Sequence, residues 1–269
     1  MTRRILGIDF SGASDAGKKV WIAEGEETSD TFRLIDLRPA SELPGGDASP
    51  LTAIAALARH IVSVPNTVAG CDFPFSIPRS LIDEPSWEAF IQAFPARFAD
   101  ADQFRDWAFR KAGMRELRRR TDRAEKTPFN SYNLRIHRQT WWGIVGLLNP
   151  FLTSRRAIIR PYQPMPRRPK PIVIEACPAC AMKSIGFYPP YKGRDASHRS
   201  ARGATLRRLV ADGYLERPGR TLTARILDNA GGDALDAVIA AIVTAGADLR
   251  HKLKGDDVFE GLIYGRLVP

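Results

Sequence analysis

ILGIDFSG, at residues 5–12, is an apolar run that ends in a carboxylate, Asp9, just before a tight Ser-Gly turn. Two further apolar runs also end in acids, VAGCD with Asp72 and IVIE with Glu175. A carboxylate at the last residue of a buried strand is held at the C-terminal edge of the sheet, where open α/β sheets place their ligands. Two unpaired carboxylates about 4 Å apart repel by roughly 4 kcal/mol at an effective dielectric near 20. The sequence therefore predicts an acidic cluster that needs a cation, a basic partner or bound protons, and a divalent cation is the simplest of these.

Two more acids stand at the start of an apolar helix expected over residues 228–247, in the stretch GGDALDAV. Asp233 and Asp236 are three residues apart, so they project from one side of the helix, about 60° apart around its axis. Capping of the helix start explains Asp233. It leaves Asp236 unexplained, because this acid borders an apolar stripe where an unpaired charge is costly. We therefore expect both acids at the same site as Asp9.

The hydrophobic pattern predicts five strands and several helices. Strands over 5–9, 18–23 and 32–37 form an antiparallel meander, a helix over 51–62 crosses over, and strands over 67–72 and 172–175 follow. Further helices are expected over 102–110, 114–123, 138–148 and 200–211. This order indicates an α/β protein.

The chain has 269 residues, of which 44% are hydrophobic, enough for a folded core. No apolar stretch approaches the ~20 residues that span a bilayer, and the N-terminus runs directly into the first strand. We expect a cytoplasmic protein without a membrane partner. Three cysteines are an odd number, which gives no disulfide framework and favours reduced thiols.

The net charge of +10 is unevenly distributed. Residues 97–170 carry 18 Lys and Arg against 6 Asp and Glu, whereas the rest of the chain carries 22 against 24. We expect residues 83–170 to be a basic helical insertion that ends in a proline-rich connector. Its aromatic residues could stack bases while its cations neutralise phosphates, or they could form a core beneath a solvated basic face. They are Phe104, Trp107, Phe109, Phe129, Tyr132, Trp141 and Trp142.

Five motifs, together with this order of strands and acids, resemble a family of uncharacterised proteins described as predicted ribonuclease H-like nucleases. The motifs are GIDFSGA (7–13), DFPFSIP (72–78), IEACPA (174–179), YKGR (191–194) and GGDALDAVIAAI (231–242). The resemblance implies one ribonuclease H-like domain over residues 1–269, with a mixed five-stranded sheet flanked by helices and the basic insertion within it.

The resemblance also implies residue roles. Asp9, Asp72 and Asp236 would be catalytic metal ligands, and Asp233 would supply a fourth carboxylate, as in the Holliday-junction-resolvase branch of the superfamily. Glu175 would be a further ligand, or an acid that pairs with Lys183 or Lys192. Mg²⁺ or Mn²⁺ prefers such oxygen ligands, and two ions activate water and stabilise the leaving 3′ oxygen in phosphodiester hydrolysis. The expected function is a metal-dependent nuclease.

Candidate phosphate contacts come from two segments. Lys192 and Arg194 flank a glycine in YKGR, and Arg118, Arg119 and Arg120 lie in the basic segment. Nucleic acid is the expected partner, with DNA or RNA, strandedness and oligomeric state left open. The apolar Phe73-Pro74 pair after Asp72 narrows the approach for a duplex.

Alternative functions remain open at this stage. Cys177-Pro178-Ala179-Cys180 follows a strand and precedes a helix, as in thiol redox motifs, although two small residues packing a tight turn would look the same. A non-catalytic nucleic-acid-binding module would keep its affinity when the acids are removed. An ATP-dependent phosphotransferase of the same fold superfamily would hold phosphate on residues 7–12, but the chain is short for the second phosphate loop.

Overall fold

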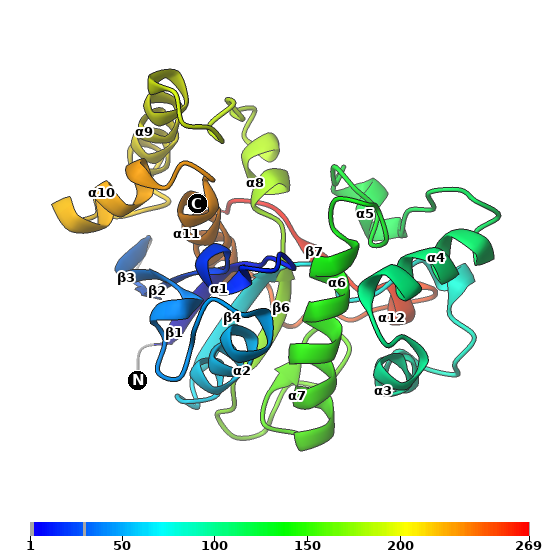
Figure 1. The fold of residues 1–269 in the computed structure, drawn as a ribbon. Helices are drawn as coiled ribbons and strands as arrows, with labels where there is room; N and C mark the ends of the chain where they lie inside the picture. The colour runs from blue at the N-terminus through cyan, green and yellow to red at the C-terminus, as the bar shows by residue number, and fades with distance from the viewer. Residues whose placement is uncertain (1–2, 29–30, 269) are drawn as a thin grey trace.

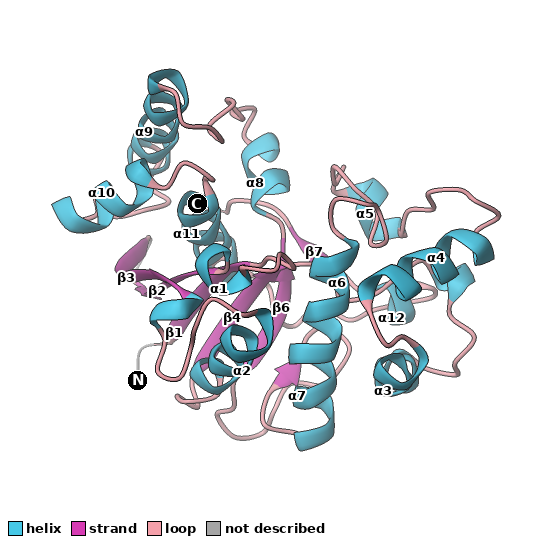
Figure 2. Ribbon diagram, viewed as in Figure 1, coloured by secondary structure: helices cyan, strands magenta, loops and turns pink. Residues whose placement is uncertain are grey.

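A mixed sheet lies between layers of helices in the computed structural model, which describes residues 3–28 and 31–268 (Figure 1). The strand order is β3-β2-β1-β4-β6-β5, and β7 also pairs with β6. Figure 2 shows these strands in magenta between the helices. The strands are β1 (Arg4–Asp9), β2 (Trp21–Glu27), β3 (Phe32–Pro39), β4 (Thr67–Asp72), β5 (Ile158–Ile159), β6 (Ile172–Ala176) and β7 (Ile263–Tyr264).

The expected antiparallel meander is confirmed, because β1 pairs with β2 and β2 with β3 in antiparallel register. Helix α2 (Pro50–Ile61), capped by the Ser49 hydroxyl, then crosses over to β4, which runs parallel to β1. The second strand begins later than expected. Residues Ala16–Lys19 form the short helix α1, whose carbonyls receive the hydrogen bond of the Val20 amide.

Within residues 3–28 and 31–268, the sheet has seven strands where the sequence predicts five. The two additional strands, β5 and β7, contain two residues each and both pair in parallel with β6. A two-residue strand offers no alternation of apolar and polar side chains, so periodicity cannot reveal it. The α/β class is as predicted.

Glycines on β1 and β4 bring the late helix α11 (Asp233–Ala245) close against the sheet. A Cβ at Gly7 would lie 2.1 Å from the Ala241 nitrogen, and one at Gly70 would lie 1.9 Å from the Thr244 hydroxyl. The two glycines are register partners. Side chains alternate along a strand, so Asp9 and Asp72 lie on the same face as these glycines, beneath the N-terminal turns of α11.

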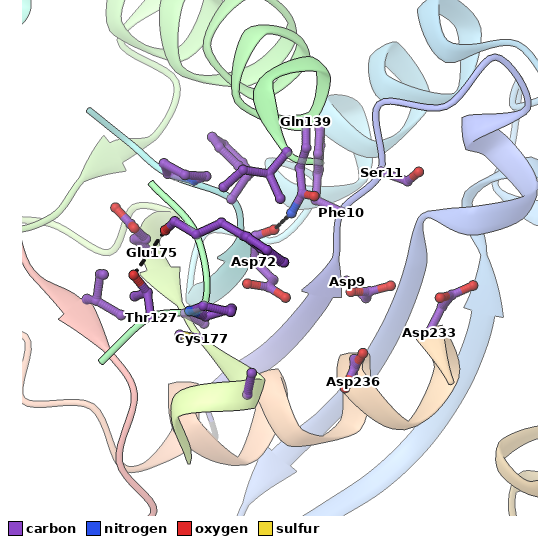
Figure 3. Close-up of a pocket in the computed structure, with 18 of the residues that line it drawn as sticks. Asp9, Phe10, Ser11, Asp72, Thr127, Gln139, Glu175, Cys177, Asp233 and Asp236 are labelled. Atoms are coloured by element: carbon purple, nitrogen blue, oxygen red, sulfur yellow. Dashed lines mark hydrogen bonds between the residues drawn. The ribbon is translucent and has the colours of Figure 1, made fainter. Parts of the chain in front are cut away.

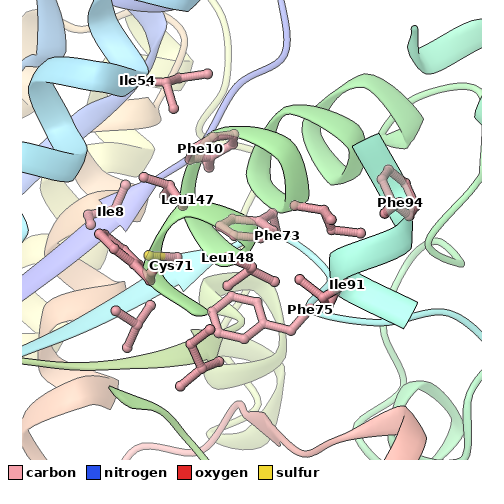
Figure 4. Packing of buried hydrophobic residues seen from close by; sticks show 14 of the residues in the cluster. Ile8, Phe10, Ile54, Cys71, Phe73, Phe75, Ile91, Phe94, Leu147 and Leu148 are labelled. Carbon is pink, nitrogen blue, oxygen red and sulfur yellow. The ribbon is translucent and has the colours of Figure 1, made fainter. Parts of the chain in front are cut away.

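The opposite face of the sheet is covered by α2 and by helices of residues 83–170, as Figure 1 shows. Leu6 and Ile8 of β1 join one hydrophobic cluster with Phe94, Phe104 and Leu147, part of which appears in Figure 4. The expected insertion therefore shares the core of the sheet. Its helices are α3 (Trp87–Arg97), α4 (Ala101–Lys111), α5 (Arg120–Ala124), α6 (His137–Gly143), the π-helical turn η3 (Ile144–Leu148) and α7 (Asn149–Ser154).

The helix expected over 114–123 is wrong. Residues 115–119 have no regular secondary structure, and only α5 is helical, with Asp122 capping its start by accepting from the Arg119 amide at 2.9 Å. The remaining helices are η1 (Ala40–Glu42), η2 (Arg79–Leu81), α8 (Pro178–Ser184), α9 (Ala196–Ala211), α10 (Arg220–Asp228) and α12 (Asp257–Glu260). Within the described residues, the structure contains no helix with the length and apolar character that crossing a membrane requires.

Candidate functional site

Four aspartates meet at the C-terminal edge of the sheet. Asp9 and Asp72 are register partners at the ends of the adjacent parallel strands β1 and β4. Asp233 and Asp236 stand in the first turns of α11, and Figure 3 shows all four carboxylates around one space. They line a pocket of about 330 Å³. The structure thus brings together the four acids that the sequence pattern singled out.

Asp236 is the most fully partnered of the four. Its side chain is buried, it accepts a hydrogen bond from the Tyr191 hydroxyl, and it lies 2.6 Å from the Lys192 ammonium. Burial lowers the pKa of Lys192, but the charges of Asp236, Asp9 and Asp233 outweigh it, so the net pKa is raised. Lys192 is therefore a fixed cation within the acidic cluster.

The other three carboxylates have neither a hydrogen-bond donor nor an ion-pair partner among the described residues. Burial first, and then the charges of Asp236 and Asp233, raise the pKa of Asp9 well above its usual range. Burial and Asp236 raise the pKa of Asp72 to about 8, and burial also raises that of Asp233. Asp9 is 8% exposed, so it is a buried acid without a donor. Such a group needs a proton or a cation.

These acids fit a hard divalent cation by their chemistry. Mg²⁺ and Mn²⁺ bind carboxylate oxygens and retain several waters, so they do not need a closed set of protein ligands. As the side chains stand, no group of three or more His, Cys, Asp or Glu within residues 3–28 and 31–268 is spaced to hold an ion. The Lys192 ammonium provides the positive charge at this place.

Glu175 lines the same pocket as the four aspartates, but its carboxylate is paired. Its two oxygens accept from the Arg119 guanidinium at 2.6 and 2.8 Å, and one also accepts from the Phe75 amide at 2.9 Å. Burial nevertheless raises its pKa. The expected pairing of Glu175 with Lys183 or Lys192 is wrong, because its oxygens accept from Arg119 and Phe75. Its role as a metal ligand stays a prediction.

Arg119 is likewise not a phosphate contact. Its side chain is 1% exposed, and besides Glu175 it binds Asp122 at 2.8 Å and the Glu260 carbonyl at 3.3 Å. Arg118 and Arg120 lie in a separate depression of about 380 Å³, where the Arg118 guanidinium donates to the Thr127 carbonyl at 2.6 Å. Arg118 and Arg120 therefore line this depression and do not line the acidic pocket.

Of the two candidates in YKGR, only Lys192 lines the acidic pocket. Arg194 is exposed and lies outside the pocket lining. Its role in binding phosphate stays a prediction.

Most aromatic side chains of the basic segment pack within the protein and are not available to stack on nucleobases. Phe104 and Tyr132 are fully buried, and the Trp141 indole donates to the Phe98 carbonyl at 3.1 Å. Phe129 is the exception, since its partly exposed side chain lines the acidic pocket. The aromatic-core interpretation therefore applies to most of the segment.

The cysteines of the Cys-Pro-Ala-Cys motif form a disulfide, contrary to the expected reduced state. Cys177 caps α8 and Cys180 lies one turn later, which places their Cα atoms 5.3 Å apart, within the usual range for a disulfide. Cys71 is free and buried. Cys177 lines the acidic pocket, so the bridge forms part of its wall.

Two site residues were not expected from sequence. The Tyr191 hydroxyl holds Asp236, and the Gln139 amide donates to the Asp72 carbonyl (Figure 3). Tyr191 is the first residue of the YKGR motif, which is the sequence signal that could have identified it. Gln139 lies 67 residues from Asp72 on α6, and no local pattern marks it.

Comparisons with models of known protein families, with curated proteins and with solved structures find no match to this chain.

Proposed function

We propose that this protein is a Mg²⁺- or Mn²⁺-dependent phosphodiesterase that cleaves nucleic acid. The observation that carries the proposal is the pair of unpartnered carboxylates, Asp9 and Asp72, side by side at the ends of two parallel strands with two more acids above them. Without a bound metal ion, the raised pKa values of Asp9 and Asp72 mean that protons and the single Lys192 ammonium must offset the acidic charge, whereas a divalent cation allows these carboxylates to ionise.

The topology supports a ribonuclease H-like fold. An antiparallel meander, a crossover helix, a parallel fourth strand and a late helix packed on the first strand occur in the order that this fold requires. The acids also fall at the expected places, on β1, β4 and α11. Fold alone says little about activity, so the chemistry of the site carries the function.

Different residues of the chain have different roles in the proposed phosphodiester hydrolysis. Asp9 and Asp72 supply hard oxygen ligands, with Asp233 and Asp236 beside them. A bound divalent ion would activate water and neutralise charge that develops on the phosphate. Lys192 lies at the same pocket and offers an ammonium to a substrate phosphate. The Tyr191 hydroxyl fixes the orientation of Asp236.

Charge supports a nucleic-acid substrate. The net charge is +10, and one surface depression is lined by the arginines Arg79, Arg118, Arg120 and Arg123. A basic protein attracts polyanions and releases their counterions on binding. The acidic pocket is thus set in a molecule that attracts the nucleic-acid backbone.

Calorimetry of Mn²⁺ binding tests the proposal, with wild type compared with Asp9→Asn. The substitution keeps the size of the side chain and removes its charge, so Mn²⁺ binding and cleavage of labelled single-stranded, duplex or branched DNA and RNA are both expected to disappear. Asp106→Asn serves as the control, because Asp106 is an exposed acid outside the pocket. Normal cleavage by a folded Asp9→Asn variant would overturn the proposal.

A further inference from the structure

The acidic pocket is also lined by aromatic side chains. Besides the four aspartates, its lining includes Phe129 and Tyr188, which come from segments far apart in the sequence. Phe129 lies in the loop between α5 and α6, and Tyr188 lies in the loop after α8. A ligand in this pocket would therefore meet both carboxylates and aromatic rings.

These two rings differ from the other aromatic residues of the lining. Phe10, Phe73 and Tyr191 are 2–3% exposed, and the first two pack against each other with centroids 4.8 Å apart. Tyr188 is 46% exposed, and Phe129 is partly exposed. Tyr188 packs edge-on against Tyr191, with ring centroids 5.9 Å apart, and both exposed rings keep surface that a ligand can contact.

Each exposed ring also has a cation over it. The Arg135 guanidinium lies 5.4 Å from the centre of the Phe129 ring, and the Lys183 ammonium lies 5.7 Å from that of Tyr188. Rings paired with cations are the surface that single-stranded nucleic acids use, because the base stacks while the cation neutralises its phosphate.

The size of the pocket limits what can reach the acids. At about 330 Å³ it lies at the small end of ligand sites, which suits one nucleotide. Bases in a duplex are stacked and paired inside the helix, so a paired base enters such a pocket only after it has been extruded, at a cost of a few kcal/mol. An unpaired base avoids this cost.

We propose that Phe129 and Tyr188, in the lining of this pocket, form a subsite for one unpaired nucleobase, so that the substrate is single-stranded nucleic acid. This inference rests on the proposed function and names its substrate class. The base stacks at Phe129 and Tyr188 while its phosphate lies toward Asp9, Asp72 and Lys192. A single strand, an overhang and a frayed end all offer such a base.

Oligonucleotides that carry 2-aminopurine at one unpaired position test the subsite, because stacking quenches the fluorescence of this base. Wild type is compared with Phe129→Ala, Tyr188→Ala and the control Tyr214→Ala, a partly exposed tyrosine outside the pocket. Binding is measured by anisotropy for a single strand, a blunt duplex and 2-aminopurine riboside monophosphate. Circular dichroism confirms that each variant is folded.

We expect the single strand to bind and its fluorescence to be quenched, with affinity about five- to a hundredfold lower in each pocket variant and unchanged in Tyr214→Ala. Quenching of the monophosphate alone, without binding of the strand, assigns the subsite to free nucleotides and overturns the strand substrate. Equal binding and cleavage of the blunt duplex, with no effect of either pocket variant, overturns the subsite while the nuclease proposal stands. Quenching without cleavage of any nucleic acid keeps the subsite and overturns the nuclease proposal.

Discussion

Asp72 gives the metal-free site a characteristic pH dependence, because burial and the charge of Asp236 raise its pKa to about 8. In the unfolded chain this carboxyl titrates near 4. A group whose pKa is raised on folding stabilises the protein fully below the unfolded pKa and loses that contribution as the pH rises through the folded pKa. Asp72 therefore destabilises the metal-free protein increasingly between pH ~4 and ~8.

We predict that Asp72→Asn is more stable than wild type at pH 8 in the presence of a chelator, by on the order of 1 to 3 kcal/mol, and that this advantage disappears near pH 4. Glu24 has a pKa lowered to about 2, so its contribution to stability is lost as the pH falls rather than as it rises. Both proteins contain Glu24, so the quantity to measure is the difference in unfolding free energy between Asp72→Asn and wild type. Urea unfolding at several pH values provides it. A constant difference across this range would contradict the raised pKa.

At the residue scale, the sequence predicted the four aspartates because strand ends and helix turns have fixed geometry. Asp9 and Asp72 end apolar runs, and Asp233 and Asp236 have helical spacing, so local rules place them. The pairing of Glu175 with Arg119 joins residues 56 apart. Three consecutive arginines look alike in the sequence, and only tertiary packing decides that the middle one is buried. The disulfide was missed because an odd count of cysteines was interpreted for the chain as a whole.

At the scale of elements, the approach of α11 to β1 positions half of the acidic cluster, and Gly7 permits that approach. We predict that Gly7→Ala costs about 3 kcal/mol or more, because its Cβ would meet backbone atoms of Ala237 and Ala241 that cannot turn away. Chemical denaturation measures the loss. Because α11 carries Asp233 and Asp236, Mn²⁺ affinity is expected to fall with stability.

Gly219→Ala is the matched control for this substitution. A Cβ at Gly219 meets nothing within 4 Å, and the residue caps the start of α10. Its cost is expected to stay below about 1 kcal/mol. Equal stability of Gly7→Ala and Gly219→Ala would show that the packing of α11 on β1 does not require a glycine at position 7.

The buried arginine Arg119 ties three elements together, since it binds Glu175 of β6, Asp122 of α5 and the Glu260 carbonyl of α12. We predict that Arg119→Met destabilises the protein by about 3–5 kcal/mol, because it leaves the Glu175 carboxylate buried and unpaired. Adding Glu175→Gln is expected to restore part of that loss by removing the charge. Thermal and urea unfolding measure both.

Arg120→Met is the control, since Arg120 is exposed and lies 3.6 Å from Asp257. Its effect is expected within about 1 kcal/mol. A loss of the same small size in Arg119→Met would mean that water or a proton already compensates Glu175.

The elements that sequence predicted best are those with a clear period. The meander, α2 and α11 have apolar residues at regular spacing, which local sequence reveals. The strands β5 and β7 are too short for a period, and residues 115–119 contain helix formers yet form no helix, and Arg119 among them is buried. Tertiary contacts of the Arg119–Glu175 ion pair therefore override the helix propensity of these residues.

At the scale of the whole molecule, the excess positive charge and the acidic pocket have separate roles. The charge is concentrated in residues 97–170, which also supply one wall of the pocket through Phe129 and Gln139. The sequence identified this concentration, because charge counts need no structure. It could not separate the arginines that fold the segment from those that remain exposed on it.

Arg120 and Arg123 are exposed in the depression they share with Arg79 and Arg118. If nucleic acid crosses this depression, each cation neutralises about one phosphate, and log affinity falls with log salt by about 0.7 per contact for a single strand. We predict that Arg120→Gln/Arg123→Gln makes the slope shallower by about 1.4 and weakens binding across all sequences.

The pair Arg207→Gln/Arg220→Gln removes the same charge from exposed positions on α9 and α10, so its slope is expected to match wild type. Anisotropy titrations between 50 and 300 mM salt measure the slopes, and equal changes in the two double variants would mean that net charge, rather than this depression, attracts the strand.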